Sequence, residues 1–224
     1  YNREKAFKPA IETANDADVI IFVGGISPRL EGEALQVKID GFDGGDKTNL
    51  DLPSVQTALL KELKKTGKPI ILVLMNGSAL SINWENENID GIIEAWYGGE
   101  AAGQAVANVL FGDYNPSGKL PVTFYKSIND IPAFDDYAMK GKTYRYCDKP
   151  VLYPFGFGLS YTKFKYSNLK LSSTVLNEKI EITVTVKNTG NMDGDEVVQL
   201  YIHQQGQQAI KELKGYRRVH LKKG

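Results

Sequence analysis

Residues 19–25 read Val-Ile-Ile-Phe-Val-Gly-Gly, a run of β-branched and aromatic side chains that ends in two glycines. A continuous apolar run of this length is typical of a parallel strand that is covered on both faces. A long loop follows, rich in glycine and acidic residues, and it carries Glu31 and Glu33. Because open α/β sheets place their chemistry in loops at the carboxyl ends of strands, we expect this loop to hold the functional residues.

Helical and strand-like segments alternate along the first half of the chain. Apolar spacing, glycines and prolines predict three helices, at residues 4–14, 53–66 and 100–111. Apolar runs predict strands at residues 19–23, 70–74, 91–96 and 120–124. The last of these contains Pro121, which lacks a backbone donor, so we expect it at an edge. This order predicts an α/β layered sandwich with a mainly parallel sheet.

The second half of the chain has a different pattern of residues. Residues 125–163 show no helical period and are dense in Tyr and Phe, which predicts an extended connector that packs against a neighbouring domain. Beyond it, residues 180–186 and 198–202 alternate apolar with polar side chains, which is typical of antiparallel strands. We predict a domain at 1–125, the connector at 126–164 and a truncated antiparallel β-sandwich at 165–224, since about sixty residues are too few for a complete one.

The composition excludes several classes of function. Lys plus Arg and Asp plus Glu each number 27, so the net charge is zero and neither nucleic acid nor an anionic membrane is an expected partner. No apolar run is long enough to cross a bilayer. The single Cys147 excludes an internal disulfide, and together with two histidines it leaves too few ligands for the usual zinc sites. No metal and no cofactor are expected.

The glycine-rich loop does not match the phosphate-binding motifs. A dinucleotide-binding turn needs a third glycine after Gly24 and Gly25, and Pro28 stands where its helix would begin. A P-loop is absent, and no nucleophile elbow is present for a serine triad. The aspartates between residues 40 and 51 offer oxygens to calcium, but their order departs from the EF-hand, and glycine-flanked aspartates are more often turn formers.

Acid/base chemistry by a carboxylate is the remaining interpretation. Cleavage of a glycosidic bond needs one carboxylic acid to protonate the leaving oxygen and a second carboxylate across the sugar ring. Glu31 and Glu33 are two residues apart, so in an extended loop they point to opposite sides and cannot form that pair with each other. One of them can be the acid if the second carboxylate comes from elsewhere. On spacing alone, two solvated glutamates are the simpler interpretation.

Several long motifs resemble the C-terminal part of glycoside hydrolase family 3, which contains β-glucosidases and β-xylosidases. The motifs are Trp96–Gly103, Asn115–Phe124, Thr143–Tyr146, Tyr153–Phe164, Val186–Gly190 and Gly194–Tyr201. The resemblance covers nearly the whole chain. It implies that residues 1–125 form the family's α/β sandwich domain without its first strands. It also implies that residues 165–224 are the beginning of a fibronectin-III-like domain.

The resemblance further implies a retaining exo-β-glycosidase that removes terminal β-linked sugars. In this family the nucleophile is an aspartate on a (β/α)8 barrel, and the general acid/base is a glutamate on a loop of the second domain. Glu31 falls at that loop position, and residues 45–50 match the segment that follows it. Glu33 is the second candidate because the loop varies in length. Arg29 is a candidate for substrate binding, although a solvated surface charge is the simpler interpretation.

No barrel is recognisable in this sequence, so the expected partners are a β-linked glycoside and an N-terminal barrel domain of the same protein. The chain alone is expected to be inactive.

The barrel provides most of the sugar pocket, so both glucose and xylose stay open as the sugar that is cleaved. The loop at residues 28–33 looks slightly more like that of xylosidases. The branch that acts on N-acetylglucosaminides commonly lacks this loop glutamate, so Glu31 argues against it. Secretion or a periplasmic location is expected from the family alone. A competing class is a non-catalytic carbohydrate-binding or interaction module that uses the aromatic connector.

Overall fold

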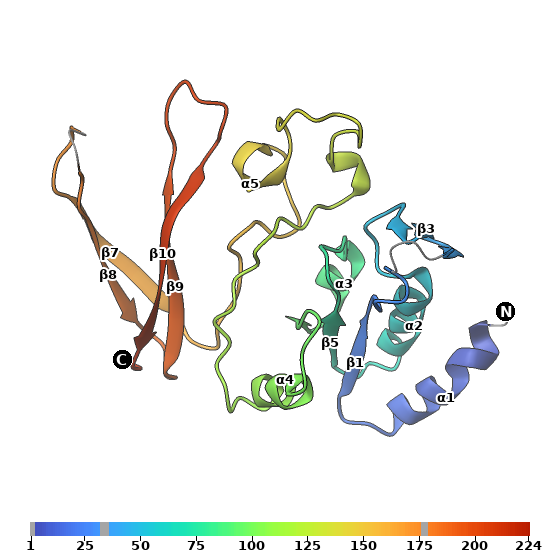
Figure 1. Ribbon diagram of the computed structural model, residues 1–224. Coiled ribbons are helices and arrows are strands. Elements are labelled where there is room, and N and C mark those ends of the chain that lie inside the picture. Colours follow the sequence, from blue (N-terminus) through green and yellow to red (C-terminus); the bar gives the residue numbers. More distant parts are fainter. Residues whose placement is uncertain (1–2, 32–35, 176–178) are drawn as a thin grey trace. The chain divides into compact units, whose positions relative to one another are not determined.

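A computed structural model describes residues 3–31, 36–175 and 179–224 (Figure 1). The chain forms two compact units, and both are discontinuous in sequence. Unit 1 comprises Tyr1–Val106 and Val122–Pro154, whereas unit 2 comprises Ala107–Pro121 and Phe155–Gly224. The chain therefore passes between the units three times, the first time inside a helix. The domain boundaries at residues 125 and 165 stay a prediction.

Unit 1 is built on a three-stranded parallel sheet in the order β1-β5-β6. Its strands are β1 (Ile20–Gly25), β5 (Ile70–Met75) and β6 (Gly91–Glu94). The central strand is the most deeply buried, and Leu72, Val73 and Leu74 are at most 1% exposed. Because the strands are parallel, their carboxyl ends share one edge of the sheet. The predicted α/β class with a mainly parallel sheet is confirmed.

Four helices precede, separate or follow the strands of this sheet along the sequence (Figure 1). They are α1 (Arg3–Asn15), α2 (Ser54–Lys64), α3 (Asn83–Asn88) and α4 (Ala102–Leu110). Leu60 and Leu63 of α2 join the core with Ile70 and Leu72, because the apolar side chains of α2 recur every three to four residues. The three predicted helices are confirmed. Helix α3 was not predicted, since its asparagines favour turns over helix interiors.

One face of β1 is exposed, so the prediction that both of its faces are covered is wrong. Val19, which precedes the strand, and Ile21 and Val23 within it are 42%, 44% and 64% exposed. At the alternate positions, Ile20 and Phe22 pack against the core. Within the described sheet β1 pairs only with β5, which makes it an edge strand.

The strand predicted at residues 120–124 does not form. Pro121 cannot donate to a ladder, and only Phe124 makes an isolated antiparallel bridge, with Tyr153. The Phe124 ring is 1% exposed and meets the rings of Trp96 and Tyr153 edge-on, with centroid separations of 6.1 and 6.0 Å. Aromatic packing thus fixes this segment instead of a ladder. The rest of the connector in unit 1 contains only the short helices η1 (Ile128–Asp130) and α5 (Thr143–Tyr146).

Unit 2 consists mainly of two antiparallel strand pairs. β7 (Phe164–Leu171) pairs with β8 (Ile182–Asn188), and β9 (Gly194–Ile202) pairs with β10 (Glu212–Leu221). The alternation predicted for β8 and β9 is confirmed as antiparallel structure. The earlier segment, residues 107–121, is bound to these later residues through Asn115. Its amide donates to the Asp193 carbonyl at 2.9 Å and accepts from the Ser160 hydroxyl and the Tyr161 N–H, each at 2.9 Å.

Candidate functional site

The acidic loop after β1 contains a small antiparallel sheet where the sequence predicted irregular structure. Its strands are β2 (Lys38–Ile39), β3 (Phe42–Asp43) and β4 (Asp46–Lys47). Glycines form the turns between them, and Gly41 and Gly44 have φ values of 88° and 63°, which glycine adopts without strain. Phe42 is 5% exposed and anchors the sheet in the core. Lys47 is the register partner of Phe42, so the turns hold Lys47 in a defined position.

Glu31 is held by hydroxyl donors from two neighbouring strand ends. The Ser78 hydroxyl donates to Glu31 Oε1 at 2.9 Å, and the Tyr97 hydroxyl donates to Oε2 at 2.5 Å. Ser78 follows β5 and Tyr97 follows β6, as expected for a site at the carboxyl edge of an open α/β sheet. The Glu31 side chain is 22% exposed, so it is fixed on both oxygens and still reachable from solvent.

Lys47 supplies the positive charge of this site. Its Nζ donates to the Ser78 hydroxyl at 2.6 Å and lies 3.8 Å from Glu31 Oε1. Burial lowers the pKa of Lys47, because desolvation disfavours the ammonium form, while the charge of Glu31 opposes that effect. Lys47 and Ser78 therefore form one polar chain that ends on the Glu31 carboxylate.

The Tyr97 hydroxyl has two acceptors but only one hydrogen. It lies 2.5 Å from Glu31 Oε2 and 2.7 Å from the Ile26 carbonyl. When Glu31 is ionised, this hydrogen can bind Oε2. When Glu31 carries a proton on Oε2, the acid can donate to the Tyr97 oxygen while Tyr97 donates to Ile26. In both protonation states of Glu31, Oε2 thus keeps a hydrogen bond to Tyr97, as acceptor when ionised and as donor when protonated, which suits a group that alternately gives and takes a proton. Burial, and then the bond to Glu31, raise the pKa of Tyr97, so Tyr97 stays a neutral donor.

A second carboxyl, Glu94, ends strand β6. Its Oε2 accepts from the Asn76 amide at 3.4 Å, and its Oε1 accepts from the Trp96 N–H at 3.2 Å. Burial raises the pKa of Glu94 to about 7, against the opposing effect of these two hydrogen bonds. Among the described residues no cation pairs with it. Glu94 is therefore a carboxyl whose protonation state changes near neutral pH.

We predict that Glu94 makes the stability of unit 1 fall as pH rises from about 4.5 to about 7. The folded state keeps the Glu94 proton in this range while the unfolded state releases it, so the proton stabilises the fold at the acidic end. The expected difference is on the order of 3 kcal/mol. Urea unfolding followed by tryptophan fluorescence at several pH values measures it, because Trp84 and Trp96 both lie in unit 1.

The Glu94→Gln variant is expected to lack this contribution to the pH dependence. Its matched control is Glu87→Gln, because Glu87 is an exposed glutamate on α3 and this variant should keep the pH dependence of the unsubstituted chain. If the Glu94→Gln and Glu87→Gln variants show the same dependence on pH, burial of Glu94 does not control the stability of unit 1.

Of the residues predicted from the sequence, Glu31 has the most defined surroundings. The Arg29 side chain is exposed and has no hydrogen-bond or ion-pair partner among the described residues. Glu33 lies outside the described residues. Ser78 and Tyr97 were missed, although Tyr97 directly follows the strand predicted at 91–96 and Ser78 comes four residues after the strand predicted at 70–74. A position after a strand is the signal that identified the Glu31 loop. Lys47 was missed because nothing local distinguishes it from other surface lysines.

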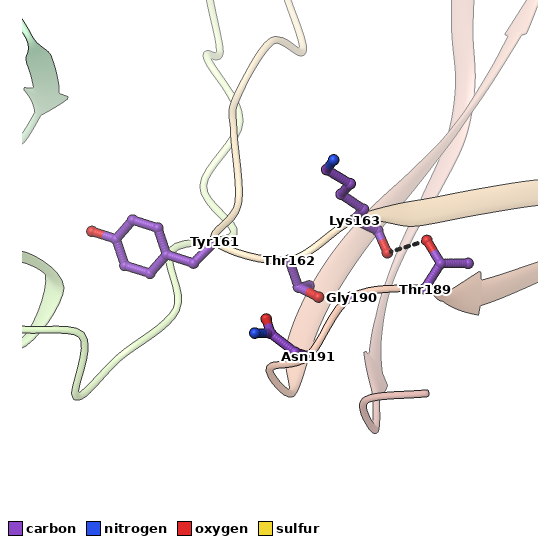
Figure 2. Close-up of a pocket in the computed structure, with 6 residues that line it drawn as sticks. All are labelled: Tyr161, Thr162, Lys163, Thr189, Gly190 and Asn191. Carbon is purple, nitrogen blue, oxygen red and sulfur yellow. Dashed lines mark hydrogen bonds between the residues drawn. The ribbon is translucent and has the colours of Figure 1, made fainter.

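A separate pocket of about 460 Å³ lies in unit 2 (Figure 2). The residues that line it include no Asp or Glu. It is lined by Tyr161, Thr162, Lys163, Thr189, Gly190 and Asn191. The Thr189 hydroxyl donates to the Lys163 carbonyl at 3.2 Å, so part of the polar lining is already satisfied. This lining offers no acid/base pair. Over the described ranges there is no group of three or more His, Cys, Asp or Glu residues placed to hold a metal, and no helix suited to crossing a membrane.

Comparison with known proteins gives consistent matches. The model of the glycosyl hydrolase family 3 C-terminal domain matches residues 2–161. A xylan 1,4-beta-xylosidase of Xylanibacter ruminicola is 46% identical over 220 residues, which are 97% of this chain and 25% of that protein. A periplasmic beta-glucosidase of Salmonella typhimurium is 39% identical over 232 residues, covering 96% of this chain and 29% of that protein. The crystal structure of a Bifidobacterium adolescentis beta-glucosidase matches 99% of this chain and 34% of its own, with a TM-score of 0.82 and 36% identity. The chain thus spans about a quarter to a third of the length of these proteins.

Proposed function

The chain belongs to glycosyl hydrolase family 3, whose C-terminal domain it contains, and on that premise we propose that it forms part of a retaining exo-β-glycosidase. In this proposal Glu31 is the general acid/base, and the nucleophilic aspartate lies on an N-terminal barrel domain of the same protein. The observation that supports it most is the Glu31 carboxyl, which is bound by Ser78 and Tyr97 and remains partly exposed.

The surroundings of Glu31 fit both halves of a retaining mechanism. In the first step an acid protonates the leaving oxygen as a carboxylate attacks the sugar carbon, and in the second the same group deprotonates water. Glu31 therefore has to exist both with and without its proton in one turnover. The Tyr97 hydroxyl stays bonded to Oε2 in both forms, because it donates to the ionised carboxylate and can accept from the protonated acid.

The sugar in the proposal is β-linked glucose or xylose. Relatives named as a xylosidase and as a glucosidase both match almost the whole chain, so both sugars stay in the proposal. The exposed Arg29 guanidinium is available to bind sugar hydroxyls. Export from the cytoplasm is also proposed, with support from the name of the periplasmic Salmonella relative.

A second candidate function is carbohydrate binding without catalysis. Phe134 and Tyr137 in the connector are 102% and 90% exposed, and exposed aromatic rings are suited to stacking on a ligand. The two functions differ in what the chain does alone. An interaction module binds sugar by itself, whereas a catalytic part needs the second carboxylate of its barrel.

The test compares this chain with the whole protein that contains it. We expect the whole protein to hydrolyse nitrophenyl β-xyloside or β-glucoside and to release the sugar first in the β configuration. The chain alone should show no hydrolysis, and calorimetric titration with xylo- and gluco-oligosaccharides should show no binding. Binding by the chain together with an inactive whole protein would favour the module instead.

We predict that Gly77→Ala impairs catalysis and leaves the fold intact. A Cβ at residue 77 would lie 2.8 Å from the Tyr97 ring and 3.2 Å from Glu31 Oε2, so we expect the Tyr97 ring to shift and its bond to Glu31 to be disturbed. Loss of a hydrogen bond to a charged group predicts a decrease in kcat/KM of about tenfold or more. Gly103→Ala is the matched control, because its new Cβ has no neighbour within 4 Å. Full activity of Gly77→Ala would show that the Tyr97 contact does not matter for turnover.

A further inference from the structure

Both loops that hold Glu31 are attached to the same side chain, Glu94. Its Oε1 accepts the N–H of Trp96, which directly precedes Tyr97. Its Oε2 accepts from the Asn76 amide, and the same Asn76 nitrogen donates to the Ser78 carbonyl at 2.9 Å. Ser78 and Tyr97 are the two hydroxyl donors to Glu31. One carboxylate therefore binds the backbone next to one donor and, through an amide, the backbone of the other.

The orientation of the Asn76 amide depends on the two oxygens that face it. Asn76 is fully buried, and its nitrogen serves both Glu94 and Ser78 while its Oδ1 has no partner. Leaving a buried amide oxygen unsatisfied is unfavourable. The amide keeps this orientation because turning it would place Oδ1 against the two acceptors. A negatively charged carboxylate at residue 94 makes this rotation of the Asn76 amide especially unfavourable.

The other loop also depends on Glu94. Trp96 has a φ of 55°, a left-handed conformation that is strained for a bulky residue. Such strain persists only where surrounding contacts hold it. The bond from the Trp96 N–H to Glu94 Oε1 is such a contact, and it sets the direction in which the chain presents Tyr97.

We propose that Glu94 is a positioning residue for the acid/base: its carboxylate fixes the two loops whose hydroxyls hold Glu31. The proposal rests on the proposed function of Glu31. Glu94 does not contact Glu31 and acts only through Ser78 and Tyr97. Both of its oxygens accept from N–H donors of this chain.

Glu94→Gln is the informative substitution because it preserves shape and removes an acceptor. If the new amide nitrogen faces Asn76, the Asn76 amide turns and the Ser78 carbonyl loses its donor. If the new nitrogen faces Trp96, the Trp96 N–H loses its acceptor. In either orientation one of the two loops is released. The substitution also removes the buried charge, so the free energy of unfolding of the variant at neutral pH should not be lower than that of the unsubstituted protein.

The experiment measures kcat/KM of the whole protein on aryl glycosides of increasing leaving-group acidity, at about pH 8, where Glu94 is ionised. Poor leaving groups need a well-placed acid, so phenyl glycosides should lose about tenfold in Glu94→Gln. Dinitrophenyl glycosides need little acid assistance and should keep nearly normal kcat/KM. Equal loss on all substrates would indicate a merely structural role and overturn the proposal.

A double-mutant cycle with Glu31→Gln identifies the route of the effect. If Glu94 acts through Glu31, adding Glu94→Gln to Glu31→Gln should not lower the residual activity further. Glu85→Gln is the control, since Glu85 is a buried glutamate that binds Thr57 and should leave the activity unchanged. Additive losses would overturn the positioning role. Normal activity of Glu31→Gln would instead contradict the proposed function. If Glu31→Gln is impaired while Glu94→Gln is normal, only the positioning role of Glu94 is contradicted.

Discussion

Replacing Glu31 by alanine should lower kcat/KM of the whole protein on poor leaving groups by about 10²- to 10⁴-fold, the range that general acid catalysis supplies. With activated leaving groups the first step no longer needs the acid, so a glycosyl-enzyme should form and then stall. Water would attack it slowly, because the base that deprotonates water is missing. A burst of aryl product followed by slow turnover is the expected time course.

Azide gives this prediction its sharpest test. A small anion that fits the space left by the Glu31 side chain needs no general base, so it should restore turnover and yield a β-glycosyl azide. Glu12→Ala on α1 is the control, because Glu12 is exposed and lies outside the site. Near-normal activity of Glu31→Ala would transfer the role to Glu33. An inactive variant that azide does not rescue would mean that the loop is structural.

Replacing Gly25 by alanine should destabilise unit 1 by about 3 kcal/mol or more and lower its melting temperature by on the order of 10 °C. Gly25 has a φ of 131°, which residues with a side chain rarely adopt, and a Cβ there would lie 2.0 Å from the Met75 carbonyl oxygen. The obstacle is backbone of the neighbouring strand, which cannot turn aside as a side chain can. The Gln56 side chain also clamps Gly25, donating to its carbonyl at 2.7 Å and accepting from its N–H at 2.8 Å.

Tryptophan fluorescence during thermal unfolding reports this change, since Trp84 and Trp96 both belong to unit 1. Gly44→Ala is the matched control. Gly44 also has a positive φ, 63°, but no atom lies within 4 Å of its added Cβ. Its substitution isolates the conformational strain, which we expect to cost about 1 kcal/mol. Equal destabilisation by the two variants would show that the contact with Met75 contributes nothing.

The regular elements of unit 1 were predictable because their signals are local. The apolar runs at 19–23 and 70–74 became parallel strands. Helix α2 ends at Lys64, and Gly67, the predicted stop, lies in the turn that follows, with a φ of 73°. The predictions failed where contacts between residues far apart in the sequence determine the local structure. The predicted strand at 120–124 found only one bridging partner, Tyr153. Helix α3 forms in spite of its asparagines, and its Glu85 accepts the Thr57 hydroxyl of α2 at 2.5 Å.

The candidate site shows the same division. Glu31 could be selected from its loop and from the family resemblance, because both are properties of contiguous sequence. Its donors could not, since Ser78 and Tyr97 are 47 and 66 residues further along the chain. The strand-end rule identifies that edge of the sheet but does not say which side chains meet there. The raised pKa of Glu94 depends on burial, which appears only once the chain has folded.

The interleaving of the two units limits how this protein can be recombined. A cut at residue 154 would leave residues 107–121 behind, although they belong to the unit formed by residues 155–224. Asn115 would then lose the Ser160, Tyr161 and Asp193 groups that satisfy its amide. A chimera that exchanges only the C-terminal strands with a relative therefore has to carry residues 107–121 with them. In evolution, these two stretches are expected to be inherited as a single module despite their separation in the gene.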